Sequence, residues 1–166
     1  PLEGVMMGTR SGDIDGGAIA FIEKKLNLDA DGVSNLLNKK SGVFGLCGYT
    51  DMRDVASAAA NGDNKAQVAE DSYFYRIKKY VGAYAAAMGG CDVLVFTAGV
   101  GENQSLMREQ VCANMEYMGI KLDKEKNNEI HGEEAVISTP DSKVKVVVIP
   151  TDEELMIARD TMALVK

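Results

Sequence analysis

Apolar residues recur every three or four positions along most of the chain, which predicts a protein built mainly of helices. The pattern covers six segments, at positions 16–26, 31–39, 51–60, 63–88, 103–117 and 151–165. Asp15 and Asp63 precede two of these segments and are expected to cap their first turns. Glycines that follow Asn61 and Met88 are typical of the residues that end helices.

Three of the predicted helices have a clear apolar face. In the longest helix we interpret this face as a core surface rather than as a platform for stacked bases. Its residues are Tyr73, Ile77, Tyr80, Val81 and Tyr84. In the next helix the residues expected to point inward are Met107, Val111, Met115 and Met118. In the last helix they are Leu155, Ala158, Met162 and Val165.

Shorter apolar runs predict a small sheet. Residues 93–96 read Val-Leu-Val-Phe, a continuous run that is typical of a parallel strand buried on both faces. Residues 135–138 and 144–149 are predicted as strands around a Pro-Asp turn. Residues 41–50, with three glycines, are predicted as a loop, and 121–134 as a solvated helix and loop. These elements predict an α/β domain that is rich in helix and has a thin sheet.

Composition and charge limit the possible functions. The chain has 166 residues, the size of one ordinary domain, and it starts in mid-motif at Pro1, so we expect it to be part of a longer protein. Its net charge of −7 argues against a general binder of nucleic acid or of anionic membranes. No apolar run approaches the ~20 residues of a membrane-spanning helix. The three cysteines lack metal-ligand spacing and are expected to be reduced thiols of a cytoplasmic protein.

The stretch from Asp92 to Asn103 is the first candidate for a binding site. Its apolar strand runs into residues 98–101, Ala-Gly-Val-Gly, a small-residue turn that lets the backbone approach a ligand. Asn103 is a suitable N-cap for the following helix, whose amino end would favour an anion. Gln104 stands where a dinucleotide fingerprint has its third glycine, and the sequence contains no P-loop motif. A tight turn without a ligand is the alternative.

Three further positions place charged side chains beside turns or helix ends. Arg10 lies among small residues, where its guanidinium either binds phosphate or carboxylate or is exposed in a flexible loop. Asp51 either caps a helix or accepts hydrogen bonds from ribose hydroxyls, with Arg53 approaching a base or phosphate. Glu153 follows a strand end, where a carboxylate is well placed for Mg²⁺. The alternative for that segment is a capping box opened by Thr151. Together these groups suit phosphoryl transfer.

Four long segments, spread over the whole chain, resemble the acetate kinases. They read PLEGVMMGTRSGDID (1–15), SGVFGLCGYTDMRD (41–54), FTAGVGEN (96–103) and IPTDEELMIARDT (149–161). The resemblance implies the actin-like ATPase fold, in which two RNase H-like domains close on a nucleotide. It also implies reversible transfer of the γ-phosphoryl group of ATP to acetate, with Mg²⁺, which gives acetyl phosphate and ADP. The family further suggests a homodimer.

The family motifs imply a role for particular residues of this chain. Arg10 matches the arginine that stabilises the transferring phosphoryl group, and Glu153 matches the glutamate that binds Mg²⁺. Two sets of residues match the family's adenosine-binding segments. They are Asp51, Met52 and Arg53 in one segment, and Gly99, Val100, Gly101, Glu102 and Asn103 in the other. The sequence departs from the family at Gly16, where proline is usual, and this puts no catalytic role in doubt.

The resemblance covers less than half of the family's enzyme. It implies that residues 1–166 are the carboxyl-terminal nucleotide-binding domain, a partial RNase H-like domain that lacks its first strands. The amino-terminal domain, a phosphate loop and a catalytic histidine would lie outside this sequence, so we expect the chain alone to be inactive and to bind ATP weakly or not at all. Two alternatives stay open: a kinase for propionate or another short-chain acid, and a non-catalytic nucleotide-binding or dimerisation module.

Overall fold

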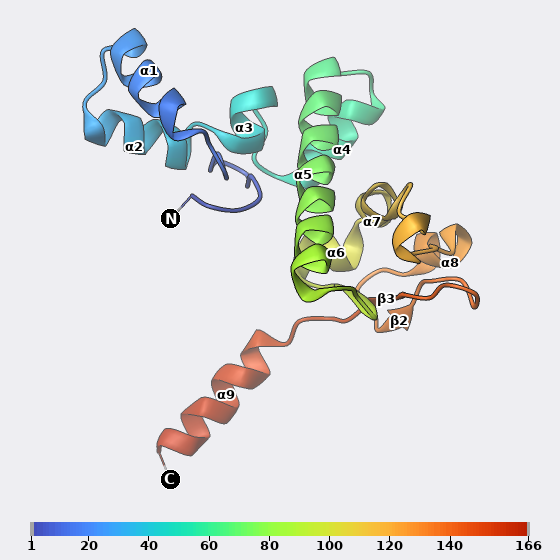
Figure 1. The fold of residues 1–166 in the computed structure, drawn as a ribbon. Coiled ribbons are helices and arrows are strands. Elements are labelled where there is room, and N and C mark those ends of the chain that lie inside the picture. The colour runs from blue at the N-terminus through green and yellow to red at the C-terminus, as the bar shows by residue number, and fades with distance from the viewer. Residues whose placement is uncertain (1, 166) are drawn as a thin grey trace. The chain divides into compact units, whose positions relative to one another are not determined.

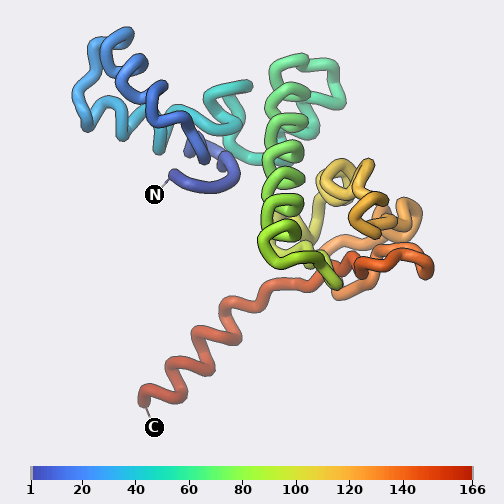
Figure 2. Tube along the Cα trace, viewed as in Figure 1, coloured from blue at the N-terminus to red at the C-terminus, as the bar shows by residue number. Residues whose placement is uncertain are grey.

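A computed structural model describes residues 2–165 and divides the chain into two compact units, Pro1–Tyr84 and Ala85–Lys166. The boundary between the units falls inside the longest helix, α5 (Asn64–Met88). Figure 1 shows the elements of both units, and Figure 2 follows the path of the chain through them. None of the helices described for residues 2–165 combines the length and the apolar character that a bilayer-spanning helix requires.

The first unit contains four helices before α5. They are α1 (Gly16–Leu26), α2 (Ala30–Lys39), α3 (Gly42–Cys47) and α4 (Met52–Ala60). Aspartate side chains begin three of them, because Asp15, Asp29 and Asp51 each accept a hydrogen bond from a backbone N–H of the first turn. Asp63 does the same for α5 through Lys65 N and Ala66 N. The helices predicted from Asp15, Asp51 and Asp63 are therefore confirmed.

The core of the first unit forms where α3, α4 and α5 meet. Val43 and Val55 are fully buried there, together with Ala66 and Ala69. The prediction that residues 41–50 are a loop is wrong, because α3 occupies most of that segment. The three glycines do not mark a loop: two of them let other backbone segments approach the helix closely, and the third ends it. A Cβ at Gly45 would lie 3.0 Å from the carbonyl oxygen of Lys40, and Gly48 ends the helix with a φ of +85°.

The apolar face predicted for α5 is only partly buried. Phe74 is the aromatic residue of this helix that is almost completely enclosed, with 2% of its surface exposed, whereas Tyr84 is 62% exposed. The remaining members of the predicted face, Tyr73, Ile77, Tyr80 and Val81, are half-buried. Small residues on the same helix reach the core instead, since α5 approaches α4 closely at its alanines.

The second unit is built on three short strands with the order β1-β3-β2. Strand β1 (Val93–Phe96) pairs in parallel with β3 (Lys145–Val148), and β2 (Ala135–Val136) pairs with β3 in antiparallel fashion. The parallel strand was predicted, but its burial on both faces was not correct. Side chains alternate along a strand, so Val93 and Val95 share one face, and both are 46% exposed. Phe96 lies on the other face and is 5% exposed.

Helices connect these strands or follow the last of them. They are α6 (Ala98–Asn103), α7 (Ser105–Cys112), the 3₁₀ turn η1 (Glu116–Met118), α8 (Lys124–Glu129) and α9 (Glu153–Leu164). Helices α7 and α8 lie next to each other beside the sheet (Figure 1). The helix predicted over 103–117 is confirmed only as α7, because Gln104 is extended before it (φ −108°, ψ 90°) and the backbone leaves the helical conformation at Ala113 (φ −59°, ψ 136°). The chain therefore turns between two short helices.

Two helices of this unit were predicted to turn an apolar face toward the core, and only one of these faces is buried. Met107, Val111 and Met115 are buried as predicted, and Met118 is half-buried. Helix α9 contains no buried residue, so the prediction that its apolar residues point into a core of the described chain is wrong. Its pattern of apolar and polar positions indicates a face that could be covered, but the side chains of α9 are exposed in this structure.

Candidate active site

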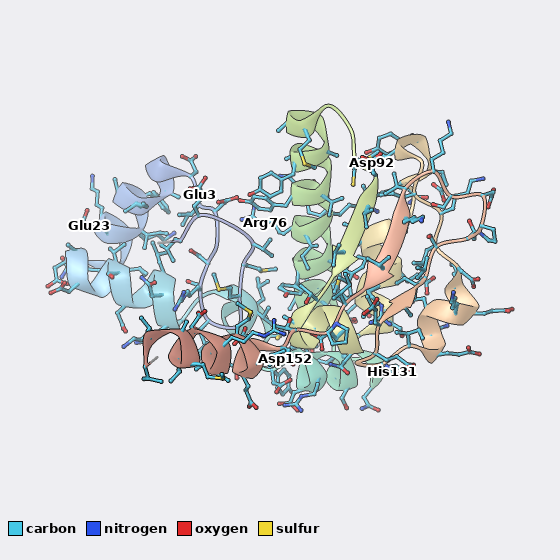
Figure 3. All side chains as sticks on the ribbon, turned by 90° about the horizontal axis from the view of Figure 1, so that it is seen from below. Glu3, Glu23, Arg76, Asp92, His131 and Asp152 are labelled. Carbon is cyan, nitrogen blue, oxygen red and sulfur yellow. The ribbon has the colours of Figure 1, made fainter. Side chains whose placement is uncertain are left out.

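The carboxyl ends of β1 and β3 meet at one edge of the sheet because the two strands are parallel. Asp92 precedes β1 and Asp152 follows β3, and Figure 3 shows them at opposite ends of the sheet. At the carboxyl end lies an open depression of about 480 Å³. Its lining residues are Ala98, Gly99, Glu102, Thr151, Asp152, Glu153 and Glu154. Ligands of open α/β sheets characteristically bind at this position.

Hydrogen bonds tie the two segments of this depression together. The carboxylate of Glu102 accepts a 2.8 Å bond from the backbone N–H of Thr151. The hydroxyl of Thr151 lies 2.7 Å from the hydroxyl of Thr97 and accepts a 3.1 Å bond from the backbone N–H of Ala98. Ala98 has a φ of +59°, which is an uncommon conformation for a residue with a Cβ. The start of α6 and the approach to α9 are thus fixed to each other.

The predicted capping box at the start of α9 does not form. Asp152 is the N-cap, and its carboxylate accepts a 2.9 Å bond from the backbone N–H of Leu155. Thr151 instead bonds to residues that follow β1, which sequence spacing could not reveal, since the partners are about fifty positions away. Because neither Thr151 nor Glu153 is needed to cap the helix, the carboxylate of Glu153 is left at the depression.

The glycine segment after β1 is helical rather than an open turn. Gly101 is buried, and a Cβ at this position would lie 3.3 Å from the backbone carbon of Phe96, so the glycine lets α6 fold back tightly against the end of β1. Asn103 was predicted to cap the next helix, and this is wrong. Asn103 is the last residue of α6, and its side-chain amide donates a 3.0 Å bond to the carbonyl of Gly99.

The acidic side chains at the depression are of a kind that suits a magnesium ion. Mg²⁺ prefers oxygen ligands and is commonly held by one or two carboxylates with water and phosphate oxygens completing the octahedron. Glu153 presents such a carboxylate, with the acidic side chains of Asp152 and Glu154 beside it. Across residues 2–165, no three acidic, histidine or cysteine side chains are arranged as a self-sufficient metal site. This donor set therefore fits Mg²⁺ bound together with phosphates.

Arg10 belongs to the first unit, in a loop whose backbone is closely held. Val43 N donates to the carbonyl of Met7, Phe44 N to that of Gly8 and Ser41 N to that of Thr9, at 2.8 to 3.0 Å. These bonds fasten the loop to the start of α3, so the flexible-loop alternative is not supported. The side chain of Arg10 is exposed, and within residues 2–165 its guanidinium forms no hydrogen bond or ion pair. It is available to a ligand.

Gly42 makes the close contact between α3 and this loop possible. Its φ is +63°, and a Cβ built on it would lie 2.1 Å from the carbonyl oxygen of Met7 and 2.6 Å from that of Arg10. No side chain fits at these distances. The position of the Arg10 backbone is therefore coupled to a glycine more than thirty residues further along the chain.

Asp51 and Arg53, also in the first unit, form an ion pair at the start of α4. The carboxylate of Asp51 accepts from the backbone N–H of Arg53 at 2.8 Å, as a helix cap, and lies 2.5 Å from its guanidinium. The side-chain bond from Arg53, and next its backbone N–H, lower the pKa of Asp51 to about 2. The same ion pair raises the pKa of Arg53. The capping role of Asp51 is confirmed, and Met52 packs half-buried against the core.

The structure thus brings some of the predicted residues together. Gly99, Glu102 and Glu153 line one depression in the second unit. Gly101 lies directly behind it, in contact with Phe96. Arg10 and the Asp51–Arg53 pair belong to the first unit.

The second unit is thus a small α/β fold with a candidate ligand site at the carboxyl ends of two parallel strands. A sequence model described as the Acetokinase family matches residues 1–159. The chain belongs to the acetokinase family. The acetate kinase of Bacteroides thetaiotaomicron is 65% identical over 167 residues, which is 100% of this chain and 42% of that protein. The acetate kinase of Carboxydothermus hydrogenoformans is 57% identical over 165 residues, 99% of this chain and 41% of that protein.

Solved structures give the same result for the fold. The crystal structure of Porphyromonas gingivalis acetate kinase superposes with a TM-score of 0.95 at 58% identity, and it covers 100% of this chain and 42% of its own. A propionate kinase from Francisella tularensis gives 0.87 at 40% identity, with 95% and 40% covered. The predicted fold, a helix-rich part of an actin-like ATPase with a small sheet, is confirmed. The chain spans about two fifths of the length of these relatives.

Proposed function

We propose that this chain is the carboxyl-terminal nucleotide-binding part of an acetate kinase. The complete polypeptide would transfer the γ-phosphoryl group of ATP to acetate and release acetyl phosphate and ADP, in a reversible reaction. The observation that carries the proposal is the depression at the ends of β1 and β3, where Gly99, Glu102 and Glu153 meet, in a chain that belongs to the acetokinase family. Activity would require the part of the enzyme that lies outside this sequence, so the chain alone would be inactive.

The depression would hold one end of the nucleotide and its metal. We assign adenosine binding to Gly99, Val100, Gly101, Glu102 and Asn103. Small residues at the start of this set leave the backbone of α6 accessible to a flat ring or a ribose. Glu153 would bind Mg²⁺, and the ion, when bound, would offset phosphate charge as the phosphoryl group is transferred. The carboxylate of Glu153 supports this role, because it lies at the depression and caps no helix.

Asp51, Met52 and Arg53 would form the second adenosine-binding segment. The carboxylate of Asp51 holds the guanidinium of Arg53 in a fixed direction while 90% of the Arg53 side chain stays exposed. An exposed guanidinium plane of this kind is able to stack on a purine ring. The half-buried Met52 packs against the core of the first unit and anchors the segment there.

Arg10 would offset the negative charge that develops on the phosphoryl group during transfer. A guanidinium is permanently charged and presents donors that match phosphate oxygens in pairs. Two features support this role: the guanidinium of Arg10 has no other described partner, and three backbone bonds fix the loop that carries it. A fixed loop keeps the charge where it is needed, which is the main requirement of phosphoryl transfer.

We also propose that the complete protein is a cytoplasmic homodimer. The family resemblance supports both points, and the three cysteines suit a reducing compartment.

The test is an assay of the complete polypeptide that contains this chain, with ATP, Mg²⁺ and acetate, in which acetyl phosphate is trapped with hydroxylamine. We expect acetyl hydroxamate to accumulate. Turnover with propionate and none with acetate would support the second candidate, a propionate kinase, which the likeness to the Francisella tularensis protein favours. Nucleotide binding by the complete polypeptide without turnover on any short-chain acid would support the non-catalytic module.

A further inference from the structure

Arg108, in α7, is a completely buried cation that no carboxylate neutralises among the described residues. Its exposed fraction is 0%, and it is the largest of the fully buried side chains. A guanidinium has five N–H groups, and all five donate here. The acceptors are the carbonyl oxygens of Gly101 (2.9 Å), Glu102 (2.8 Å), Asn127 (2.9 Å) and Ile130 (2.7 Å) and the side-chain oxygen of Asn127 (2.8 Å).

These acceptors come from the carboxyl ends of two helices. Gly101 and Glu102 lie in the last turn of α6, and Asn127 lies in the last turn of α8, which Ile130 follows. Carbonyls at a helix end lack partners within the helix and carry partial negative charge. These carbonyl oxygens replace the water molecules that the guanidinium loses on burial. Without them, burial of the charged group would be very unfavourable. Burial still lowers the pKa of Arg108.

The Arg108 contacts lie directly behind the depression. Its two bonds to α6 reach Gly101 and Glu102, the part of the segment to which we assign adenosine binding. Glu102 in turn accepts from the backbone N–H of Thr151 through its carboxylate, and Thr151 immediately precedes the Asp152-Glu153 pair. A continuous chain of hydrogen bonds therefore leads from Arg108 to both sides of the depression.

We propose that Arg108 is a positioning residue for nucleotide binding, which acts through the backbone of Gly101 and Glu102 and touches no ligand. The inference rests on the proposed function, because it takes the depression as the nucleotide site. A lysine cannot replace the guanidinium, since one ammonium with three donors cannot reach acceptors on two separate helix ends in a plane. Without these bonds the α6 backbone loses its fixed position, and the site it forms becomes less complementary to the nucleotide.

Asn127 has a supporting role in the same arrangement. Its side-chain oxygen accepts from the Nε of Arg108, and its side-chain amide donates a 2.9 Å bond to the carbonyl of Ser105. It is 0% exposed, although it lies in a segment of charged residues. Replacement of Asn127 by alanine would remove one of the five bonds to Arg108 and leave the others in place.

The test compares three variants of the complete polypeptide by ADP calorimetry, by kinetics with ATP and acetate, and by thermal unfolding. Arg108→Lys should raise the dissociation constant for ADP and the KM for ATP by roughly tenfold or more, with a smaller change in kcat and in the KM for acetate. Asn127→Ala should change the same two constants in the same direction by less. Met115→Ala is the control, because Met115 is 1% exposed in the same unit and does not line the depression. It should lower the melting temperature and leave both nucleotide constants unchanged.

The outcomes separate this inference from the proposed function. If Arg108→Lys lowers the melting temperature as Met115→Ala does but binds ADP like the wild type, Arg108 is only structural and the inference is wrong. If Arg108→Lys does not fold, unchanged ADP binding by Asn127→Ala overturns the inference. A wild type that binds ADP but phosphorylates neither acetate nor propionate removes the proposed reaction and leaves the inference standing. A wild type that binds no nucleotide removes both.

Discussion

Replacement of Gly42 by alanine should disturb the Arg10 loop from a distance. The new Cβ would lie 2.1 Å from the carbonyl oxygen of Met7 and 2.6 Å from that of Arg10, well inside ordinary contact distance. The methyl group cannot rotate out of this position, because it is attached directly to the backbone. The loop must therefore move away from α3, and the three backbone bonds that join them must lengthen or break.

The free-energy cost has two parts, and Gly62 separates them. Both glycines have a positive φ, +63° at Gly42 and +89° at Gly62, but a Cβ at Gly62 would meet nothing within 4 Å. Gly62→Ala should therefore cost only the conformational penalty of about 1–2 kcal/mol. Gly42→Ala should add about 1–3 kcal/mol for the overpacked contact, which gives a total of about 2–5 kcal/mol.

The assay measures thermal unfolding and kinetics of the complete polypeptide for both variants. The contact at Gly42 must open by about 1 Å, and a displacement of this size at a catalytic group commonly lowers turnover by about 10–100-fold. We expect such a fall in kcat for Gly42→Ala and less than about a twofold change for Gly62→Ala, whose strain lies outside the Arg10 loop. Equal melting temperatures and equal kcat values for the two variants would refute the reasoning.

Three other predictions concern the charged residues. Arg10→Ala should lower kcat by about 100-fold or more and change the KM for ATP by less than about threefold, because the role we propose for Arg10 is a contact made mainly in the transition state; a raised KM with kcat intact would contradict that role. Glu153→Ala should raise the Mg²⁺ concentration needed for half-maximal activity, whereas Glu154→Ala, in the same depression, should not; equal effects would contradict a specific ligand role. Because the pKa of Asp51 is lowered, its ionised carboxylate stabilises the folded state fully above pH 3.8, the usual pKa of an aspartate. This stabilisation is lost as the pH falls through about 2. Carbon NMR of the Asp51 carboxyl should show this, and Arg53→Ala should move the pKa back toward 3.8; a pKa that stays near 2 would mean that the Arg53 side chain is not its cause.

Much of the helical structure could be predicted because its signals are local. The starts of α1, α4 and α5 follow Asp15, Asp51 and Asp63, and each aspartate bonds to a backbone N–H only two or three residues away. A capping bond of this range depends on only a few consecutive residues, so the sequence pattern can predict it. The parallel strand before α6 was predicted for the same reason, from a short continuous apolar run.

Two segments were predicted wrongly from their glycines, because those glycines are required by contacts with residues distant in the sequence. In α3 and α6 we expected a loop and a turn, and both segments are helical. Gly42 and Gly101 are required by the atoms they approach, the carbonyl of Met7 and the end of β1, and not by a break in the helix. A glycine looks the same in a sequence whether it ends a helix or allows another segment to come close.

The Arg108 network could not be found from sequence patterns. Arg108 appears as an ordinary polar position of a helix, and Asn127 lies in a charged stretch that we interpreted as solvated, yet both are 0% exposed. Their contacts join positions about twenty residues apart, through carbonyl oxygens that every residue possesses. The bond between Glu102 and Thr151 likewise spans nearly fifty residues. The candidate site residues could be named from motifs, but the groups that hold them in place required the three-dimensional structure.

The use of main-chain oxygens by Arg108 has an evolutionary consequence. Four of its five acceptors belong to the backbone, so a change of side chain at Ile130 would leave the bond between its carbonyl and Arg108 in place. Correlated substitution reveals contacts between side chains, and it would link Arg108 to Asn127 at most. We therefore expect homologous proteins to vary more at Ile130 than at Arg108.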